Sequence, residues 1–315
     1  MIKPCHVGLR ALAMLFASSS HSVALAVDWA RVESRNMTLF YPGQASWEWV
    51  LTDHSAAKSV RKGSPCRECH EKEESDMGKL LVKGPKFEPT PINGKPGSIE
   101  IAIQTAYDSD KFYLRAQWRD TGFRAKIAMD HDNQIKFALM LDDGNVKEAA
   151  VAGCWGACHV DASHMPSHSG DVARTLYLSA SREKATRTGG GDALKPAAEI
   201  KQMYDDGAFL EYWQARASVG KPTVGASGYI LDQRHEYTGK VIETSAELKG
   251  GMWTVEFVRK RHINAKGYKD LDETKIYNIG FALHDAWTKE RFHYVSFGHT
   301  LALGEQKADI NAKKQ

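Results

Sequence analysis

The amino-acid sequence predicts a mainly β fold, an antiparallel β-sandwich that contains one helical insertion and follows a shorter N-terminal segment. In several short stretches apolar and polar residues alternate, and this period of two is typical of half-buried strands. Turn-forming residues separate these stretches. One stretch in the second half of the chain instead spaces its apolar residues as a helix does. Short strands with a single helical interruption favour a sandwich.

Residues 1–26 are predicted to be a secretory signal peptide. Lys3 and Arg10 precede an apolar stretch, and Ala24-Leu25-Ala26 offers a small-x-small cleavage site. A membrane anchor is the alternative, but the apolar run is interrupted at 18–22 and is too short to span a bilayer. We therefore expect a periplasmic protein that is not inserted in the membrane once the signal is removed.

Composition and charge indicate a globular protein and give no indication of nucleic-acid binding. The 315 residues are 42% hydrophobic and 26% charged, which is typical of a globular protein with a real core. Loss of Lys3 and Arg10 with the signal lowers the formal charge from +3 to about +1. This small charge gives no indication of a nucleic-acid partner, which would favour a concentrated basic face.

Once Cys5 is lost with the signal, all remaining cysteines lie in two motifs. In the first, residues 66–70 read Cys-Arg-Glu-Cys-His. Cys66 and Cys69 have the spacing at which each can form a thioether to a haem vinyl group, and His70 then ligates the iron. We predict a covalently attached haem c at this motif.

A second, irregular motif follows, in which three residues separate Cys154 from Cys158 and His159 comes next. We predict a second covalent haem c here, although the extra residue departs from the usual spacing. Two alternatives would also explain four exported cysteines that occur in two pairs: two disulfides, or one zinc site with four cysteine ligands. Neither alternative requires a histidine directly after the second cysteine of both pairs.

The N-terminal haem segment is predicted to span 27–94 and to supply a second ligand for its iron. His54 lies twelve residues before Cys66, and Met77 lies seven after His70. We favour His54. Histidine gives lower reduction potentials than methionine, so the choice affects function. The aromatic residues expected to cover the porphyrin are Phe40, Tyr41, Trp47 and Trp49.

The sandwich itself is predicted to occupy 95–305. Its first three strands are expected at 98–103, 112–119 and 134–141. In the second strand, Phe112, Leu114, Ala116 and Trp118 are expected to face the core. In the third strand, Ile135, Phe137, Leu139 and Leu141 are expected to do the same. The third strand ends at 142–145, Asp-Asp-Gly-Asn. The paired aspartates could bind calcium, but a turn needs them equally, and we favour the turn.

The later elements follow the second cysteine motif. We predict a short strand at 175–181, the helical insertion at 193–218, and strands at 251–259, 276–285 and 291–303. Residues 286–290 form the loop between the last two strands, and 306–315 are expected to be a polar tail.

With these elements in place, the chain resembles the haem-binding domain of the ethylbenzene dehydrogenase family, the electron-transferring γ subunits of dimethylsulfoxide-reductase-type molybdoenzymes. It is most similar to the exported c-type cytochrome branch of that family. The resemblance covers roughly 95–305. It is carried by 111–120 (Lys-Phe-Tyr-Leu-Arg-Ala-Gln-Trp-Arg-Asp), by 153–159 followed by Met165-Pro166, and by 281–296.

The resemblance implies a sandwich that holds one haem against its sheet. In the molybdoenzyme subunits that haem is b-type, with methionine and lysine ligands. Here the loop that would bring the methionine carries Cys154, Cys158 and His159, and His293 falls at the position of the lysine. The resemblance therefore suggests a covalent haem with His159 proximal and His293 distal. The rival ligands are His164, Met165, His284 and His299.

His293 also has an argument from the residues alone. It shares a predicted strand face with Val295 and Phe297, where a buried imidazole needs a partner. An iron or a backbone carbonyl would each meet that need.

Together these features predict an exported dihaem c-type cytochrome that transfers electrons and turns over no substrate. The resemblance implies redox partners: a membrane quinol-oxidising cytochrome and a periplasmic molybdoenzyme or terminal reductase. The alternative is a haem enzyme, a peroxidase or small-oxoanion reductase, with an open iron site at the second haem and Asp161, His164 and His168 as acid–base groups. A haem-based ligand sensor is a third hypothesis.

Overall fold

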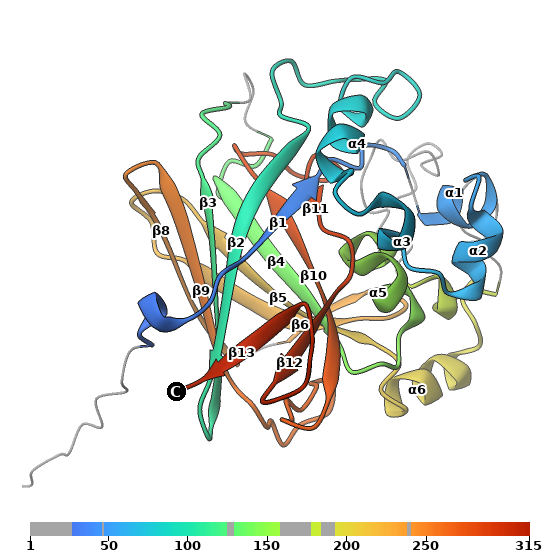
Figure 1. Ribbon diagram of the computed structural model, residues 1–315. Coiled ribbons are helices and arrows are strands. Elements are labelled where there is room, and N and C mark those ends of the chain that lie inside the picture. The colour runs from blue at the N-terminus through green and yellow to red at the C-terminus, as the bar shows by residue number, and fades with distance from the viewer. Residues whose placement is uncertain (1–26, 46, 125–128, 158–177, 184–192, 238–240) are drawn as a thin grey trace, which may run out of the picture.

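The computed structural model describes residues 27–45, 47–124, 129–157, 178–183, 193–237 and 241–315. They form a β-sandwich with helices gathered on one side (Figure 1), which confirms the predicted fold class. The strands are β1 (Arg35–Phe40), β2 (Ser98–Tyr107), β3 (Lys111–Arg119), β4 (Ile135–Asp142), β5 (Leu210–Ala217), β6 (Val224–Ile230), β7 (Arg234–Glu236), β8 (Ile242–Lys249), β9 (Met252–Lys260), β10 (Ile276–His284), β11 (Tyr294–Val295), β12 (His299–Leu303) and β13 (Ile310–Lys314).

One hydrogen-bonded path links most of these strands in the order β7-β6-β5-β4-β10-β11-β1-β2-β3-β9-β8. The path folds back on itself, so that β8 lies beside β5 and β6. The described pairs are antiparallel except for the two made by β13, which runs parallel to β12 and β2.

The core lies between the two halves of this path and follows the predicted alternation. All four inward residues predicted on β3, and all four on β4, are buried. Phe137 of β4 stacks on Phe281 of β10 with ring centroids 5.9 Å apart, and on Trp118 of β3 at 5.5 Å. The opposite faces of β4, β5 and β10 are therefore turned away from this core and are available for a second site.

The helices cover that outer side. They are α1 (Trp47–Thr52), α2 (Ala57–Lys62), α3 (Arg67–His70), α4 (Glu74–Leu81), α5 (Lys147–Ala152) and α6 (Ala197–Asp205), with the 3-10 helices η2 (Gly153–Ala157) and η3 (Ser179–Ser181). The 3-10 helix η1 (Trp29–Arg31) lies apart from them, beside β2 and β3 (Figure 1). In Figure 1, α1 to α5 lie together beside the sheet. None of the helices in the described ranges has the length and apolar character needed to cross a membrane.

Three predicted elements need correction. The strand predicted at 291–303 is interrupted, because only Tyr294–Val295 (β11) and His299–Leu303 (β12) are strands there. The predicted helix at 193–218 is wrong in its second half: α6 ends at Asp205, Gly207 turns with φ of 77°, and Leu210–Ala217 is β5. Tertiary packing overrides the helical spacing there, because β5 pairs with both β4 and β6. Of the predicted strand at 175–181, residues 175–177 lie outside the described residues, and Ser179–Ser181 is η3.

Both segments that flank the predicted sandwich contribute a strand to it. β1 comes from the predicted N-terminal haem segment and pairs with β2 along six residues. The predicted polar tail contains β13, which Ile310 and Ala312 anchor in the core. The boundaries after residues 94 and 305 remain predictions.

Candidate haem-binding sites

The first cysteine motif forms α3. Cys66 precedes the helix, and its N–H donates to the Val151 carbonyl at 2.9 Å. Residues three positions apart lie on the same face of a helix, so the thiols of Cys66 and Cys69 can both bond to one porphyrin. Cys66 is buried and Cys69 is exposed, as expected for a haem attached at the edge of the protein.

The ring of His70 is oriented by a carboxylate. Its Nδ1 lies 2.9 Å from Glu73 Oε2, so the imidazole N–H donates to the carboxylate. This tautomer leaves the lone pair on Nε2, which is the usual arrangement of a metal-ligating histidine. Glu73 was not identified from the sequence: it lies past the end of α3, directly before α4, and the non-helical turn at 71–72 brings it back to His70.

His54 faces His70. Their ring centroids are 6.0 Å apart, with the planes inclined at 67°. Metal–imidazole bonds are about 2 Å long, so two rings on opposite sides of one metal ion have centroids about 6 Å apart. The spacing therefore fits bis-histidine ligation. Burial and the neighbouring His70 both lower the pKa of His54, which keeps its imidazole neutral, as a ligand requires.

One contact of His54 opposes this arrangement. Its Nδ1 accepts the Ala56 N–H at 3.1 Å, which places the ring proton on Nε2. Iron binding through Nε2 requires that this hydrogen bond be given up. Met77, on α4, is half-buried and packs against the same cluster as Cys66, so it remains the alternative ligand.

An apolar cluster covers this site. Phe40 and Trp47 are buried in the cluster that contains Cys66, and Trp49 packs against it, 5.3 Å from the His54 ring. These three aromatics lie where the sequence predicted them. Tyr41 does not: it belongs to the core of the sandwich, and its hydroxyl donates to Glu88.

The second motif begins in η2, directly on the sheet. A Cβ at Gly280 of β10 would lie 2.6 Å from the Cys154 nitrogen, and one at Gly298 would lie 2.6 Å from the Ala149 carbonyl oxygen. Both positions therefore need glycine so that α5 and η2 can approach the strands. A glycine inside a strand pattern was the available sequence signal for this contact.

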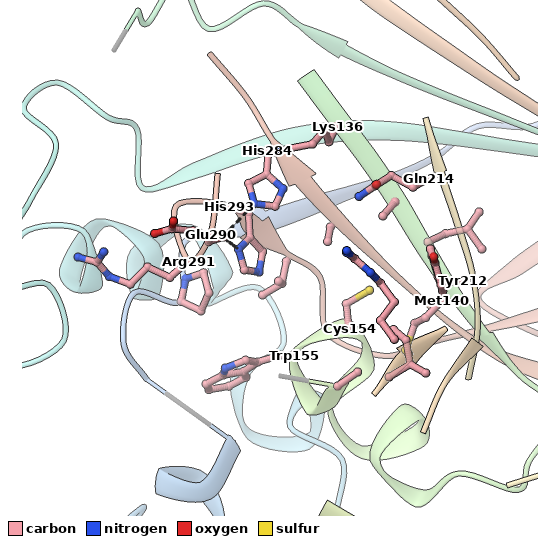
Figure 2. A pocket seen from close by; sticks show the side chains of 18 of the residues that line it. Lys136, Met140, Cys154, Trp155, Tyr212, Gln214, His284, Glu290, Arg291 and His293 are labelled. Atoms are coloured by element: carbon pink, nitrogen blue, oxygen red, sulfur yellow. Dashed lines mark hydrogen bonds between the residues drawn. The ribbon is translucent and has the colours of Figure 1, made fainter. Parts of the chain in front are cut away.

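Cys154 and His293 line one cavity of about 480 Å³ on the outer face of β4, β5 and β10 (Figure 2). This volume lies within the range of small-molecule and cofactor sites, about 300–1,000 Å³. His293 precedes β11 instead of lying within a strand, and it is half-buried. Two residues predicted to bind one haem thus meet at one cavity.

Glu290 orients the two histidines of this cavity. Its carbonyl lies 2.8 Å from His293 Nδ1 and 2.9 Å from His284 Nε2 (Figure 2), and the rings are 4.9 Å apart. A carbonyl accepts only, so each nitrogen donates. The lone pair of His293 then lies on Nε2, the tautomer of a metal ligand. The backbone partner anticipated for His293 is thus present and is compatible with ligation.

Three basic side chains line one part of the cavity, and two of them are paired with carboxylates that also line it. Lys136 pairs with Asp130 at 2.6 Å and Arg216 with Glu236 at 2.8 Å. Arg234 also lines the cavity and has no carboxylate partner among the residues described. Guanidinium groups bind carboxylates such as haem propionates in two-pronged geometry.

Part of the predicted site cannot be placed. Cys158 and His159 lie outside the described residues, as do the rival ligands His164 and Met165. His299 is buried beside Arg67, 3.3 Å from its Nη1, and is not among the residues that line the cavity.

The structure describes three of the four cysteines in the two motifs, Cys66, Cys69 and Cys154. Cys66 and Cys69 are free and not joined as a disulfide. Burial raises the pKa of the Cys66 thiol to about 11 and that of Cys154 to about 12, so both are neutral thiols at neutral pH. Within the described ranges, no three His, Cys, Asp or Glu side chains converge to hold a metal ion such as zinc.

The sequence was also compared with known proteins. A family profile described as "Ethylbenzene dehydrogenase" matches residues 26–248. Cytochrome c-552 of Stutzerimonas stutzeri is 34% identical over 304 residues, 95% of each chain. Cytochrome c-551 of Rhodocyclus tenuis is 28% identical over 295 residues, 92% of this chain and 100% of that protein.

Among solved structures, a family 9 carbohydrate-binding module from Caldicellulosiruptor kristjanssonii in complex with cellotriose matches with a TM-score of 0.28 and 9% identity, covering 64% of this chain and 65% of that one. A putative carbohydrate-binding protein from Bacteroides uniformis matches with a TM-score of 0.29 and 9% identity, covering 66% and 72%. These scores carry no argument about ligands. The sequence matches are decisive, and the chain belongs to the ethylbenzene dehydrogenase family.

Proposed function

We propose that this chain is an exported dihaem c-type cytochrome that carries single electrons between redox proteins. The observation that carries the proposal is the first site, where His54 faces His70 at the spacing of a six-coordinate iron beside a Cys-x-x-Cys pair. An iron with both axial positions filled exchanges electrons but binds no substrate. The two relatives named as cytochromes c support the same function.

When bound, each haem supplies a one-electron iron couple. The residues of this chain do the rest: the cysteines attach the porphyrin, Glu73 orients His70, and the apolar cluster around Cys66 excludes water. At the second site, the Glu290 carbonyl orients His293 and the cationic residues suit the propionates.

The first site also reaches the surface. Cys69 is exposed, and the His70 side chain keeps 29% of its accessible area. An exposed haem edge suits the small, transient interfaces of redox partners. We propose that these are a membrane quinol-oxidising cytochrome and a periplasmic molybdoenzyme or terminal reductase. The enzyme alternative depends on Asp161, His164 and His168, which lie outside the described residues.

The test is a pyridine haemochrome assay combined with intact mass on the mature protein. Two covalent haems are expected, with c-type bands and a mass gain of two haem groups. A single haem would contradict the dihaem proposal. A high-spin oxidised haem that binds cyanide rapidly would contradict the assignment as a pure carrier.

The distal ligand of the first haem is tested with a matched pair of variants. His54→Ala is expected to turn this haem high-spin, because the iron loses an axial ligand, whereas Met77→Leu is expected to leave it low-spin. Optical and electron paramagnetic resonance spectra of the oxidised proteins measure the spin state. The reverse result, with Met77→Leu high-spin and His54→Ala low-spin, would assign Met77 as the ligand.

A further inference from the structure

The two cysteine motifs are neighbours, although some 80 residues separate them in the sequence. Cys66 donates its N–H to Val151, three residues before Cys154. Cys66, Val151 and Trp155 are buried in one apolar cluster, against which Cys154 packs. Haems attached at these two motifs would therefore both adjoin this apolar cluster.

Phe297 occupies the space between the motifs. It lies between β11 and β12 and is only 1% exposed. Its ring stacks on that of His70, with centroids 6.3 Å apart and planes inclined by 24°. The Trp155 ring also neighbours Phe297, with centroids 6.4 Å apart and planes inclined by 44°. Phe40 packs against both, 4.8 Å from Phe297 and 5.6 Å from Trp155.

Trp155 continues this contact to the second site. It follows Cys154 directly and lines the cavity that contains His293 (Figure 2). Its Nε1 donates to the Ala45 carbonyl at 2.7 Å, which fixes the ring. The Trp155 side chain thus packs in the cluster with Phe297 and also lines the cavity.

Backbone contacts hold these rings in place. Gly153 has φ of 65°, and a Cβ there would lie 2.5 Å from the Gly298 nitrogen. The residue after Phe297 and the residue before Cys154 are therefore packed backbone to backbone. The separation of the Phe297 and Trp155 rings is set by this contact and not by side-chain rotation alone.

We propose that Phe297 and Trp155 form the electron-transfer bridge between the two haem sites. In each transfer, one iron changes from ferrous to ferric while the other changes from ferric to ferrous, and no proton or bond is exchanged. Conjugated rings in contact couple two redox centres better than a gap or a saturated side chain, because their π orbitals extend across the contact. The inference rests on the proposed dihaem function.

Ordinary core packing would also place a phenylalanine here, so the test must separate coupling from structure. The variants are Phe297→Leu, Phe297→Met and Phe297→Tyr, with Phe112→Leu as a matched control, since Phe112 is 1% exposed in the sandwich core. Pulse radiolysis measures the rate at which an electron equilibrates between the haems. Redox titration gives the two potentials, and paramagnetic coupling between the oxidised haems reports their separation.

We expect Phe297→Leu and Phe297→Met to slow inter-haem equilibration severalfold, with the haem count, potentials and paramagnetic coupling retained. Phe297→Tyr, which keeps the ring, and Phe112→Leu should equilibrate at the original rate. An unchanged rate in both ring-less variants would overturn the bridge while leaving the dihaem function intact. A parent protein with only one haem would overturn both, as the haem count shows directly.

Discussion

Replacement of both Cys154 and Cys158 by serine is expected to remove one of two covalent haems. Serine forms no thioether, so the second porphyrin loses both attachments while the first keeps Cys66 and Cys69. Intact mass should fall by one haem group, and the pyridine haemochrome absorbance should halve. The matched variant, Cys66→Ser with Cys69→Ser, should lose the other haem and leave the Cys154 site loaded.

The double variant also decides between the readings of the irregular motif. If the mass of the Cys154 and Cys158 variant differs from the parent only by the sulfur-to-oxygen changes, no haem was attached there. The cavity lined by Cys154 and His293 would then hold a non-covalent group or none. Because Cys154 is half-buried against the sheet, a modest loss of stability, about 1–3 kcal/mol, is compatible with either result.

The strands that the sequence predicted well are those with one buried face. In β3 and β4, alternate residues face the core, and the period of two is visible in the sequence. β5 was missed because its first four residues are all buried, so no alternation marks it. β13 was missed because only Ile310 and Ala312 are buried in a short polar segment.

Among the site residues too, those that depend on local sequence could be predicted, and those that depend on packing could not. Motif spacing identified Cys66, Cys69 and His70, because attachment chemistry depends on local sequence. The pairing of His54 with His70, the contact of Gly280 with Cys154, and the position of Phe297 depend on packing between distant segments. Such contacts leave only weak signals in one sequence. The prediction of His293 came from family resemblance, and the structure adds its cavity and its partner, Glu290.

A second large effect is expected at Lys95, the first residue of the predicted sandwich. Its ammonium group is buried beneath the rings of Tyr294 and Tyr41, 4.1 and 5.4 Å from their centroids. Nζ has no hydrogen-bond partner among the described residues. Burial lowers the pKa of Lys95 to about 7, despite the opposing attraction of Asp285 and Glu88.

This shift has a defined sign. The unfolded chain binds the lysine proton up to a pKa of about 10.4, whereas the folded protein releases it from about pH 7. Between these values the unfolded state holds more protons, so the free energy of unfolding should rise with pH by up to about 1.4 kcal/mol per unit. Below pH 7 this contribution is constant and unfavourable.

Because the buried ammonium costs stability at pH 7, Lys95→Met should raise the free energy of unfolding there by about 1–4 kcal/mol and abolish the rise between pH 7 and 10. The two carboxylates keep other partners: Asp285 accepts the Thr121 hydroxyl at 2.7 Å, and Glu88 pairs with Arg291. Denaturant unfolding followed by circular dichroism at several pH values measures both effects. The control Lys249→Met, at an exposed lysine of β8, should change stability by less than about 0.5 kcal/mol. A less stable Lys95→Met protein at pH 7 would instead show that the buried ammonium is needed as the counter-charge of Asp285, and that its attraction exceeds its desolvation.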